Sequence, residues 1–221
     1  MDPFRPRPEA LPASFPVFPL AGALLLPGGR LPLNIFEPRY LAMVEDALAA
    51  GRMFGMVLPD PVHPRLAGRS ALYGVGCLGR IASFAETEDG RYLITLIGVS
   101  RFRVAEELPD SPRGYRRIRA DHTPYATDLA DPPAAAAVDR ATLLAAVRDY
   151  FQAQRIEADW PAIERTAPPM LVTTLCMVCP FTDAEKQALL EAPDLGRRAA
   201  MLVSLMQMDS AGPAAGAERP S

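Results

Sequence analysis

The sequence has almost no lysine: Lys186 is the only one among 23 basic residues, and all the others are arginine. A phosphate-binding P-loop requires Gly-Lys-Ser or Gly-Lys-Thr, whereas Lys186 stands between Glu185 and Gln187 in a helical pattern. A Ser-Lys catalytic dyad would need the same lysine, and no serine stands near it in a supporting context. We therefore predict that these 221 residues hold no P-loop and no Ser-Lys peptidase centre, and we expect no enzymatic activity.

Cysteine and histidine are also scarce, with three and two residues. Cys176 and Cys179 form a Cys-x-x-Cys pair, but a structural zinc site needs four ligands, and Cys77 stands alone in a strand-like segment. His63 and His122 have no ligand-like spacing, and prolines flank His63 in an extended turn. We predict that Cys176 and Cys179 pack in a core helix, and we expect no metal, no cofactor and no catalytic residue.

Long apolar runs are missing as well. Proline or glycine interrupts every candidate before it reaches the ~18 residues of a membrane helix. The first residues, MDPFRPRPEALPAS, lack the charged-then-apolar order of a signal peptide, so we expect a cytoplasmic location. The net charge of −3 provides little attraction to nucleic acid.

What the chain does contain is an ordered series of apolar segments near its start. The turn Pro27-Gly28-Gly29 predicts that Leu24–Leu26 reverses into Leu31–Ile35 as two strands. Glu37 before Pro38 predicts a helix start, because proline at the first helical position loses only an N–H without an intrahelical partner. The apolar residues that follow share one helical face: Tyr40, Leu41, Val44, Ala47 and Leu48.

Short strand signals continue up to residue 122. Glu88-Asp89-Gly90 predicts a hairpin turn, since Asp-Gly readily takes the conformations that match strand twist. Phe102 and Val104 alternate with Arg101, Arg103 and Ala105, which indicates a half-buried strand with these two arginines on the wet side. The predicted strands are Met53–Leu58, Leu72–Phe84, Tyr92–Val99, Phe102–Glu106 and Arg116–Asp121.

The hydrophobic period changes to a helical one after a segment without any period, Pro124–Pro133. Thr182 and Glu185 form a capping box, and Asp194 is a helix cap. The predicted helices are Val138–Gln154, Pro168–Cys179, Thr182–Glu191 and Asp194–Met208. The domains that follow are a flexible lead (1–13), a barrel (14–122), a linker (123–133), a helical bundle (134–209) and a disordered tail (210–221).

Taken together, these motifs resemble the N-terminal substrate-binding domain of the ATP-dependent Lon proteases over roughly residues 14–209. That domain begins with an apolar pair, a Pro-Gly turn and Pro-Leu, followed by a short stretch before a helix. The matching residues are Phe18-Pro19-Leu20, Pro27-Gly28, Leu31-Pro32-Leu33, Phe36-Glu37-Pro38-Arg39, Phe54–Leu58, Tyr73–Gly76, Gly79–Ile81 and Leu93–Phe102. The resemblance implies an α+β fold: a small PUA-like mixed β-barrel with an embedded helix, followed by a C-terminal α-helical bundle.

The resemblance also implies a function. We expect a stand-alone, non-catalytic binding protein that engages exposed peptide segments of unfolded proteins, or a protein partner such as a protease. Phe36, Glu37, Arg39 and Tyr40 are the candidate binding residues, because they open a helix and their side chains face a cleft between helix and barrel in this hypothesis. The competing interpretation of the same cluster is a helix cap, a local ion pair and a packed tyrosine.

RNA binding is the alternative function, because PUA-like barrels also occur in RNA-binding proteins. The predicted basic strip consists of Arg101, Arg103, Arg113, Arg116, Arg117 and Arg119. Carboxylates at Glu106, Glu107, Asp110 and Asp121 interrupt it, so peptide binding remains the first hypothesis.

Overall fold

The computed structural model describes residues 10–63, 69–130 and 138–210. They fall into two compact units, one of residues 1–131 and 177–191 and one of residues 132–176 and 192–221, which we describe separately. Most of the predicted lead and nearly all of the predicted tail lie outside the described residues.

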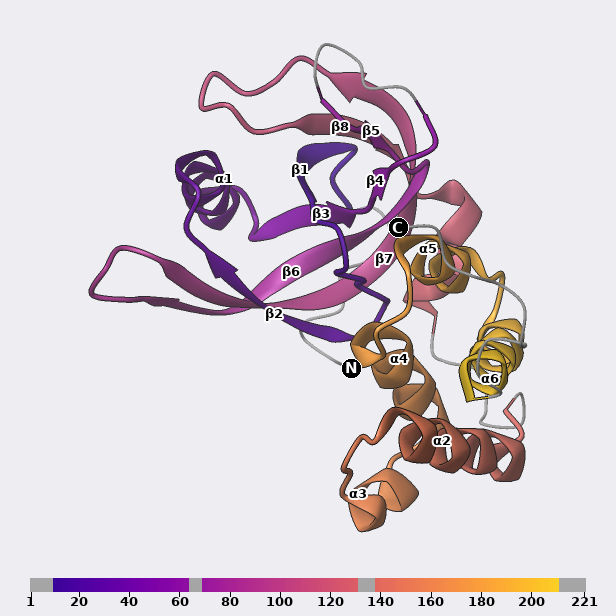
Figure 1. Cartoon of the computed structure of the whole chain (residues 1–221). Coiled ribbons are helices and arrows are strands. Elements are labelled where there is room, and N and C mark those ends of the chain that lie inside the picture. Colours follow the sequence, from indigo (N-terminus) through magenta and orange to yellow (C-terminus); the bar gives the residue numbers. More distant parts are fainter. Residues whose placement is uncertain (1–9, 64–68, 131–137, 211–221) are drawn as a thin grey trace. The chain divides into compact units, whose positions relative to one another are not determined.

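The first unit contains a mixed six-stranded sheet in the order β2-β7-β6-β3-β1-β8 (Figure 1). β7 also pairs with β8, so the sheet nearly closes into a barrel. Only β1 and β3 run parallel among these neighbours. The strands are β1 (Ser14–Pro19), β2 (Arg30–Ile35), β3 (Met53–Val57), β6 (Val75–Glu86), β7 (Tyr92–Leu108) and β8 (Arg117–Asp121), and a separate ribbon joins β4 (Pro59–Asp60) and β5 (Ala71–Leu72).

One strand, β7, holds most of the sheet together. Its first half pairs with β2 and β6, and its second half pairs with β6 and β8. Phe102 on β7 is fully buried in a cluster with Phe15, Val17 and Ile118. Gly76 on β6 makes room for this ring, because a Cβ there would lie 2.5 Å from it. The two separate strands predicted at 92–99 and 102–106 are thus one.

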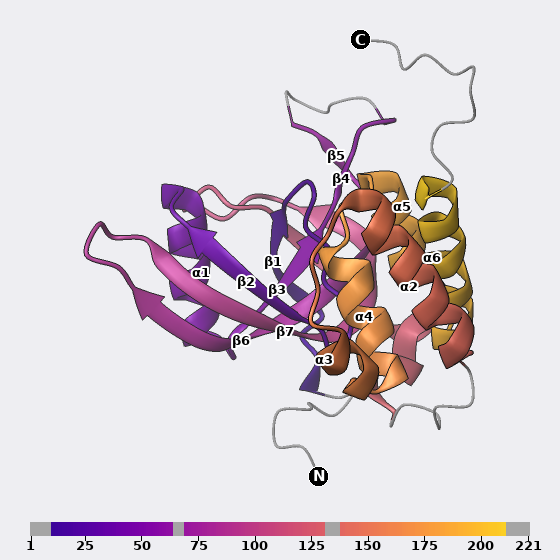
Figure 2. The same ribbon diagram turned by 60° about the horizontal axis from the view of Figure 1, so that its bottom comes forward.

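Helix α1 (Pro38–Ala49) is the helix embedded in this unit. Glu37 is its N-cap residue and Pro38 its first residue, which confirms the predicted start. Met43, Val44 and Ala47 are buried on its inner side. Figure 2 shows the long β6–β7 hairpin, whose predicted turn ends in Gly90 with a φ of +76°.

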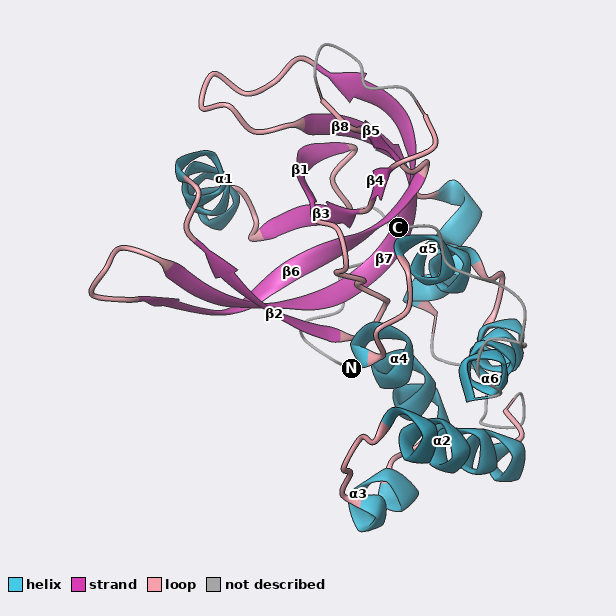
Figure 3. Ribbon diagram, in the orientation of Figure 1, coloured by secondary structure: helices cyan, strands magenta, loops and turns pink. Residues whose placement is uncertain are grey.

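The predicted strand at Leu24–Leu26 is wrong. These three leucines are buried, but they belong to the loop between β1 and β2 (Figure 3). The loop passes so close to β7 that a Cβ on Gly98 would lie 2.0 Å from the Leu26 carbonyl oxygen. The leucines therefore pack under the sheet instead of pairing with β2.

Helix α5 (Asp183–Glu191) belongs to the first unit, although the sequence-based division places it with the later helices. Lys186, the only lysine, is buried there and donates a 2.5 Å hydrogen bond to the Gly22 carbonyl. Gly22 in turn donates its N–H to Asp183 at 2.7 Å. The predicted capping box is confirmed, since Thr182 and Glu185 bond each other's backbone N–H at 2.8 and 3.3 Å.

The second unit is helical. Its helices are α2 (Arg140–Gln154), α3 (Trp160–Arg165), most of α4 (Pro168–Val178) and α6 (Leu195–Ser210). Asp139 caps α2, and Asp194 accepts a 2.8 Å hydrogen bond from Arg197 N–H at the start of α6. Sequence reasoning missed α3 and the short 3-10 helix η2 (Thr123–Leu129) of the first unit, which lies inside the predicted linker. The predicted α+β fold, a small mixed barrel with an embedded helix followed by helices, is confirmed.

Candidate protein-binding surface

The four residues predicted to bind a partner divide into two groups. Arg39 donates to the Glu37 carboxylate at 2.8 Å, and both side chains are about half exposed. Tyr40 is buried, its ring lies 4.2 Å from that of Phe18, and the Arg39 guanidinium lies 4.6 Å from its centroid. Burial raises the pKa of the Tyr40 hydroxyl. These three residues form the local ion pair and packed tyrosine of the competing interpretation, while Phe36 is 61% exposed.

Phe36 follows the last residue of β2 and continues the solvent-facing side of the sheet. In β2 the burial alternates, with Leu33 and Ile35 buried and Pro32 and Asn34 exposed. This is the two-residue period of a strand with one wet face. The Arg91 guanidinium lies 5.8 Å from the Phe36 ring centroid, so the start of β7 flanks the same place.

The pairing register of β2, β7 and β6 shows which other residues share this solvent-exposed side of the sheet, which we call the open face. Asn34, Leu93 and Ala85 lie side by side on β2, β7 and β6, and so do Pro32, Thr95 and Ser83. A third row contains Arg30, Ile97 and Arg80. The open face is therefore defined by these nine residues together with Phe36 at one end.

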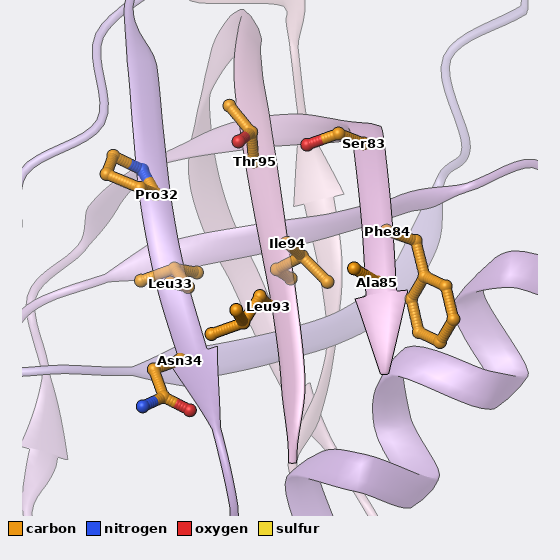
Figure 4. Close-up of a pocket in the computed structure, with 9 residues that line it drawn as sticks. All are labelled: Pro32, Leu33, Asn34, Ser83, Phe84, Ala85, Leu93, Ile94 and Thr95. Atoms are coloured by element: carbon orange, nitrogen blue, oxygen red, sulfur yellow. The ribbon is translucent and has the colours of Figure 1, made fainter. Parts of the chain in front are cut away.

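A shallow hollow of about 470 Å³ lies on this part of the sheet (Figure 4). Two exposed large apolar side chains project from opposite faces of the sheet here: Leu93, 46% exposed, on the open face, and Phe84, 41% exposed, which pairs with buried Ile94. Phe84 is held edge-on against Tyr92, with 4.9 Å between ring centroids. The residues that line the hollow are Pro32, Leu33, Asn34, Ser83, Phe84, Ala85, Leu93, Ile94 and Thr95.

Hydrogen bonds fix α1 beside the hairpin that carries the hollow. Tyr92 donates to Glu45 of α1 at 3.0 Å, and Tyr115 donates to Asp46 at 2.6 Å. Arg113 donates to both carboxylates, at 2.7 Å to Asp46. The Arg113 and Tyr92 donors lower the pKa of Glu45, and the Tyr115 hydroxyl, followed by Arg113, lowers that of Asp46. This cluster gives Phe36, two residues before α1, a fixed anchor.

Strand β2 is an edge of the described sheet, and proline protects it. Gly98 donates its N–H to the Gly29 carbonyl at 2.9 Å. Counting from Gly29 and Gly98, every second residue pair between β2 and β7 is therefore a hydrogen-bonded pair. Pro32 then lies in a non-bonded pair with Thr95, where an N–H would point outward and where proline has none. A partner strand would find no donor at this position, which favours contacts with the open face over strand addition.

The two histidines and three cysteines, all in the described part of the chain, lie outside the open face. Among the described residues, no group of three or more His, Cys, Asp or Glu side chains is arranged to hold a metal ion. His63 is hydrogen bonded to Asp60 at 2.6 Å, and His122 lies 3.3 Å from two backbone carbonyls. All three cysteines are buried.

Sequence reasoning missed Leu93, Phe84 and the hollow itself. The available signal was the position of these two apolar residues on either side of the Glu88-Asp89-Gly90 turn, at the exposed tip of a hairpin. Phe36 was the one member of the open face that the sequence singled out.

Comparison with known proteins identifies the fold. Residues 14–208 match the family of the ATP-dependent protease La (LON) substrate-binding domain. The chain belongs to this family. Two solved structures are similar to it over most of their length. One is a Lon N-terminal domain protein from Xanthomonas campestris, with 26% identity, a TM-score of 0.58, and coverage of 86% of this chain and 97% of that one.

The N-terminal domain of a Mycobacterium avium complex Lon protease shows the same fold, with a TM-score of 0.58 at 21% identity and coverage of 88% and 98%. Lon protease 2 of Myxococcus xanthus is 26% identical over 90% of this chain and 24% of its own length. The Lon protease of Anaeromyxobacter dehalogenans is 30% identical over 51% of this chain and 13% of its own length. This Lon substrate-binding domain thus spans at most about a quarter of these two proteases, and the match includes neither ATPase nor peptidase. No helix in the described ranges is long and apolar enough to cross a membrane.

Proposed function

We propose that this Lon substrate-binding domain binds exposed apolar segments of other proteins on its open face, without catalysis. The observation that carries the proposal is the hollow on the open face with the exposed Leu93 side chain, and Phe36 further along the same side. Large apolar side chains gathered at one exposed place on a sheet mark an interaction surface. The family supports a protein as the ligand.

The size and openness of the hollow favour short, weak contacts. Fully burying one large apolar side chain contributes about 1.5–3 kcal/mol. Two or three such contacts contribute about 3–9 kcal/mol, so after the free energy lost in ordering a peptide we expect a Kd no tighter than roughly 10 μM. Such an affinity suits a domain that samples many unfolded segments.

Ion pairing argues against RNA binding. All six arginines of the predicted basic strip lie in the described part of the chain, and four of them are paired with carboxylates. These pairs are Arg101–Asp128, Arg113–Glu45, Arg116–Glu107 and Arg119–Glu106. Since nucleic-acid affinity depends on arginines available to phosphates, this strip offers little of it.

The test uses a fluorescein-labelled 12-residue peptide with the core Leu-Phe-Val-Leu, neutral Ser-Gly flanks and an amidated C-terminus. A second peptide has serine at the four apolar positions. We expect fluorescence anisotropy to show binding of the first peptide only. The double variant Phe36→Ser/Leu93→Ser, which removes the two exposed large apolar side chains of the open face, should weaken it at least fivefold.

Val62→Ser is the matched control, because Val62 is 82% exposed and does not line the hollow. Equal binding of both peptides, or full binding by the double variant, would overturn the proposal. A salt-sensitive shift with a 20-nucleotide single-stranded RNA at 50 mM salt, without peptide binding, would favour the alternative.

A further inference from the structure

We propose that Arg30 and Arg80 form an acid-recognising end of the open face, so that the domain prefers apolar segments flanked by aspartate or glutamate. The inference rests on the proposed function, because it names the class of segment that the same face takes. It is carried by the position of the two arginines and by their lack of partners.

The register places the two arginines on either side of Ile97. Arg30 of β2 and Arg80 of β6 are both paired with this residue of β7. Neighbouring strands lie about 4.8 Å apart, so the two arginine Cα atoms are separated by roughly 10 Å. The next row on the same side, Pro32, Thr95 and Ser83, already lines the hollow and lies about 7 Å further along the strands.

Arg30 and Arg80 differ from most arginines of this unit, and the others that likewise make no ion pair among the described residues, Arg52, Arg103 and Arg117, lie outside the open face. Within residues 10–63, 69–130 and 138–210, neither makes a side-chain hydrogen bond or an ion pair. Seven arginines of the same unit do pair with carboxylates: Arg39, Arg69, Arg91, Arg101, Arg113, Arg116 and Arg119. Two guanidinium groups without carboxylates make this end of the face positive.

The opposite end of the open face is neutral. Arg91, which lies over Phe36, is paired with Asp89 at 2.7 Å. The face therefore has a polarity: an apolar middle, one positive end and one balanced end. Guanidinium groups bind carboxylates with charge-assisted hydrogen bonds, and complementary charge sets register and partner choice at an interface.

Two guanidinium groups can bind two carboxylates, and acidic side chains supply both, whereas a free C-terminus supplies only one. Alternate residues of an extended peptide point to the same side and lie about 7 Å apart. Two acidic residues at i and i+2, next to the apolar core, bring two carboxylates within reach of both guanidinium groups, because the arginine side chains are long and adjustable and their Cα atoms lie only roughly 10 Å apart.

The experiment compares four labelled peptides that share the core Leu-Phe-Val-Leu, using the full 221-residue chain. Three have amidated ends and carry Asp-Ser-Asp, Asn-Ser-Asn or Lys-Ser-Lys after the core. The fourth has a neutral flank and a free C-terminal carboxylate. We expect the Asp-Ser-Asp peptide to bind roughly three- to tenfold more tightly than the Asn-Ser-Asn peptide at 50 mM salt. That difference should shrink at 500 mM salt.

Arg30→Gln/Arg80→Gln should abolish the difference between the Asp and Asn peptides and leave binding of the Asn peptide unchanged. Arg30→Glu/Arg80→Glu should reverse the preference toward Lys-Ser-Lys. Arg103→Gln is the matched control, because Arg103 is an exposed arginine of β7, the strand between β2 and β6, but lies outside the open face. Circular dichroism and unfolding curves establish that each variant is folded.

The outcomes separate this inference from the proposed function. Equal binding of the Asp and Asn peptides, or a preference that survives Arg30→Gln/Arg80→Gln, would overturn the acid-recognising end alone, as long as Phe36→Ser/Leu93→Ser still weakens binding. A gain confined to the free carboxylate peptide would overturn the assignment to side chains. If none of the four peptides binds to the wild-type chain, both proposals fail.

Discussion

Arg101 and Asp128 form a buried ion pair in the barrel unit, with side chains 4% and 9% exposed. The Arg101 guanidinium donates to the two Asp128 oxygens at 2.8 and 2.9 Å, and the Arg101 backbone N–H adds a third bond at 2.9 Å. A further guanidinium nitrogen donates to the Leu190 carbonyl at 3.1 Å, and the group lies 4.5 Å from the Tyr125 ring centroid. One side chain thus joins β7, η2 and the end of α5.

Removing one partner of this pair should destabilise the protein strongly. Asp128→Ala leaves a buried guanidinium without its carboxylate, and such a loss reduces the free energy of unfolding by about 3–5 kcal/mol. The measurement is urea unfolding followed by circular dichroism. The exposed pair Arg119–Glu106, 3.3 Å apart, provides the control: Glu106→Ala should change stability by less than about 1 kcal/mol. Equal effects of the two variants would refute the structural role assigned to Arg101.

Arg101 also shows where sequence reasoning reached its limit in the fold. The alternation along residues 101–105 predicts a solvent-exposed Arg101. This prediction is wrong, because Asp128, 27 residues later in the sequence, binds the Arg101 side chain in the interior. Signals contained within a few residues were reliable: the Glu37-Pro38 helix start, the Asp-Gly turn and the Thr182–Glu185 box all form as predicted. Contacts between distant segments, including the Leu24–Leu26 loop under Gly98, have no such local signal.

Gly98→Ala should be severely destabilising. The new Cβ would lie 2.0 Å from the Leu26 carbonyl oxygen, so the loop or β7 must move, and overpacking of this kind lowers the free energy of unfolding by about 3 kcal/mol. Gly74→Ala is the matched control, because nothing lies within 4 Å of its added Cβ. Thermal unfolding of both variants measures the effect, and a Gly98→Ala protein as stable as Gly74→Ala would contradict the close approach.

The hydrogen-bonded carboxylates of α1, Glu45 and Asp46, should make the stability of the folded protein depend on pH. The pKa values of Glu45 and Asp46 are lowered below their ordinary 4.5 and 3.8 by donors that exist only in the folded chain. A carboxylate whose pKa is lower in the folded than in the unfolded chain stabilises the fold at pH values above its unfolded pKa. This contribution disappears as the pH falls through the pKa of the folded state. Stability should therefore decrease as the pH drops below about 4.5.

The variant that tests this dependence is Arg113→Gln, because Arg113 donates to both carboxylates. Urea unfolding at several pH values between 2.5 and 6 should give a flatter acid slope for Arg113→Gln than for the wild type. Arg197→Gln, an exposed substitution near the start of α6, should leave the slope unchanged. An identical slope in Arg113→Gln would show that the cluster is not coupled to folding.

The candidate site was less predictable than the fold, because its parts come from three strands that are far apart in the sequence. Pro32, Ser83 and Thr95 become neighbours only through the register of β2, β7 and β6. The sequence does contain the alternation that exposes Leu93 beside buried Ile94, but alternation alone leaves open which side of a strand is wet. The lack of partners for Arg30 and Arg80 likewise depends on where every carboxylate of the unit lies.

Phe36 provides the sharpest test of the residues that the sequence selected. Since Phe36 is 61% exposed on the open face while Glu37 and Arg39 are bonded to each other, only Phe36 has an apolar surface to offer a ligand. Phe36→Ser should weaken binding of the neutral Leu-Phe-Val-Leu peptide roughly two- to fivefold, because less apolar area is removed from water. Glu37→Gln/Arg39→Gln, which removes the ion pair at the start of α1 next to Phe36, should leave the Kd for this peptide unchanged. The reverse pattern, with loss of binding in Glu37→Gln/Arg39→Gln and none in Phe36→Ser, would move the ligand from the open face to the start of α1.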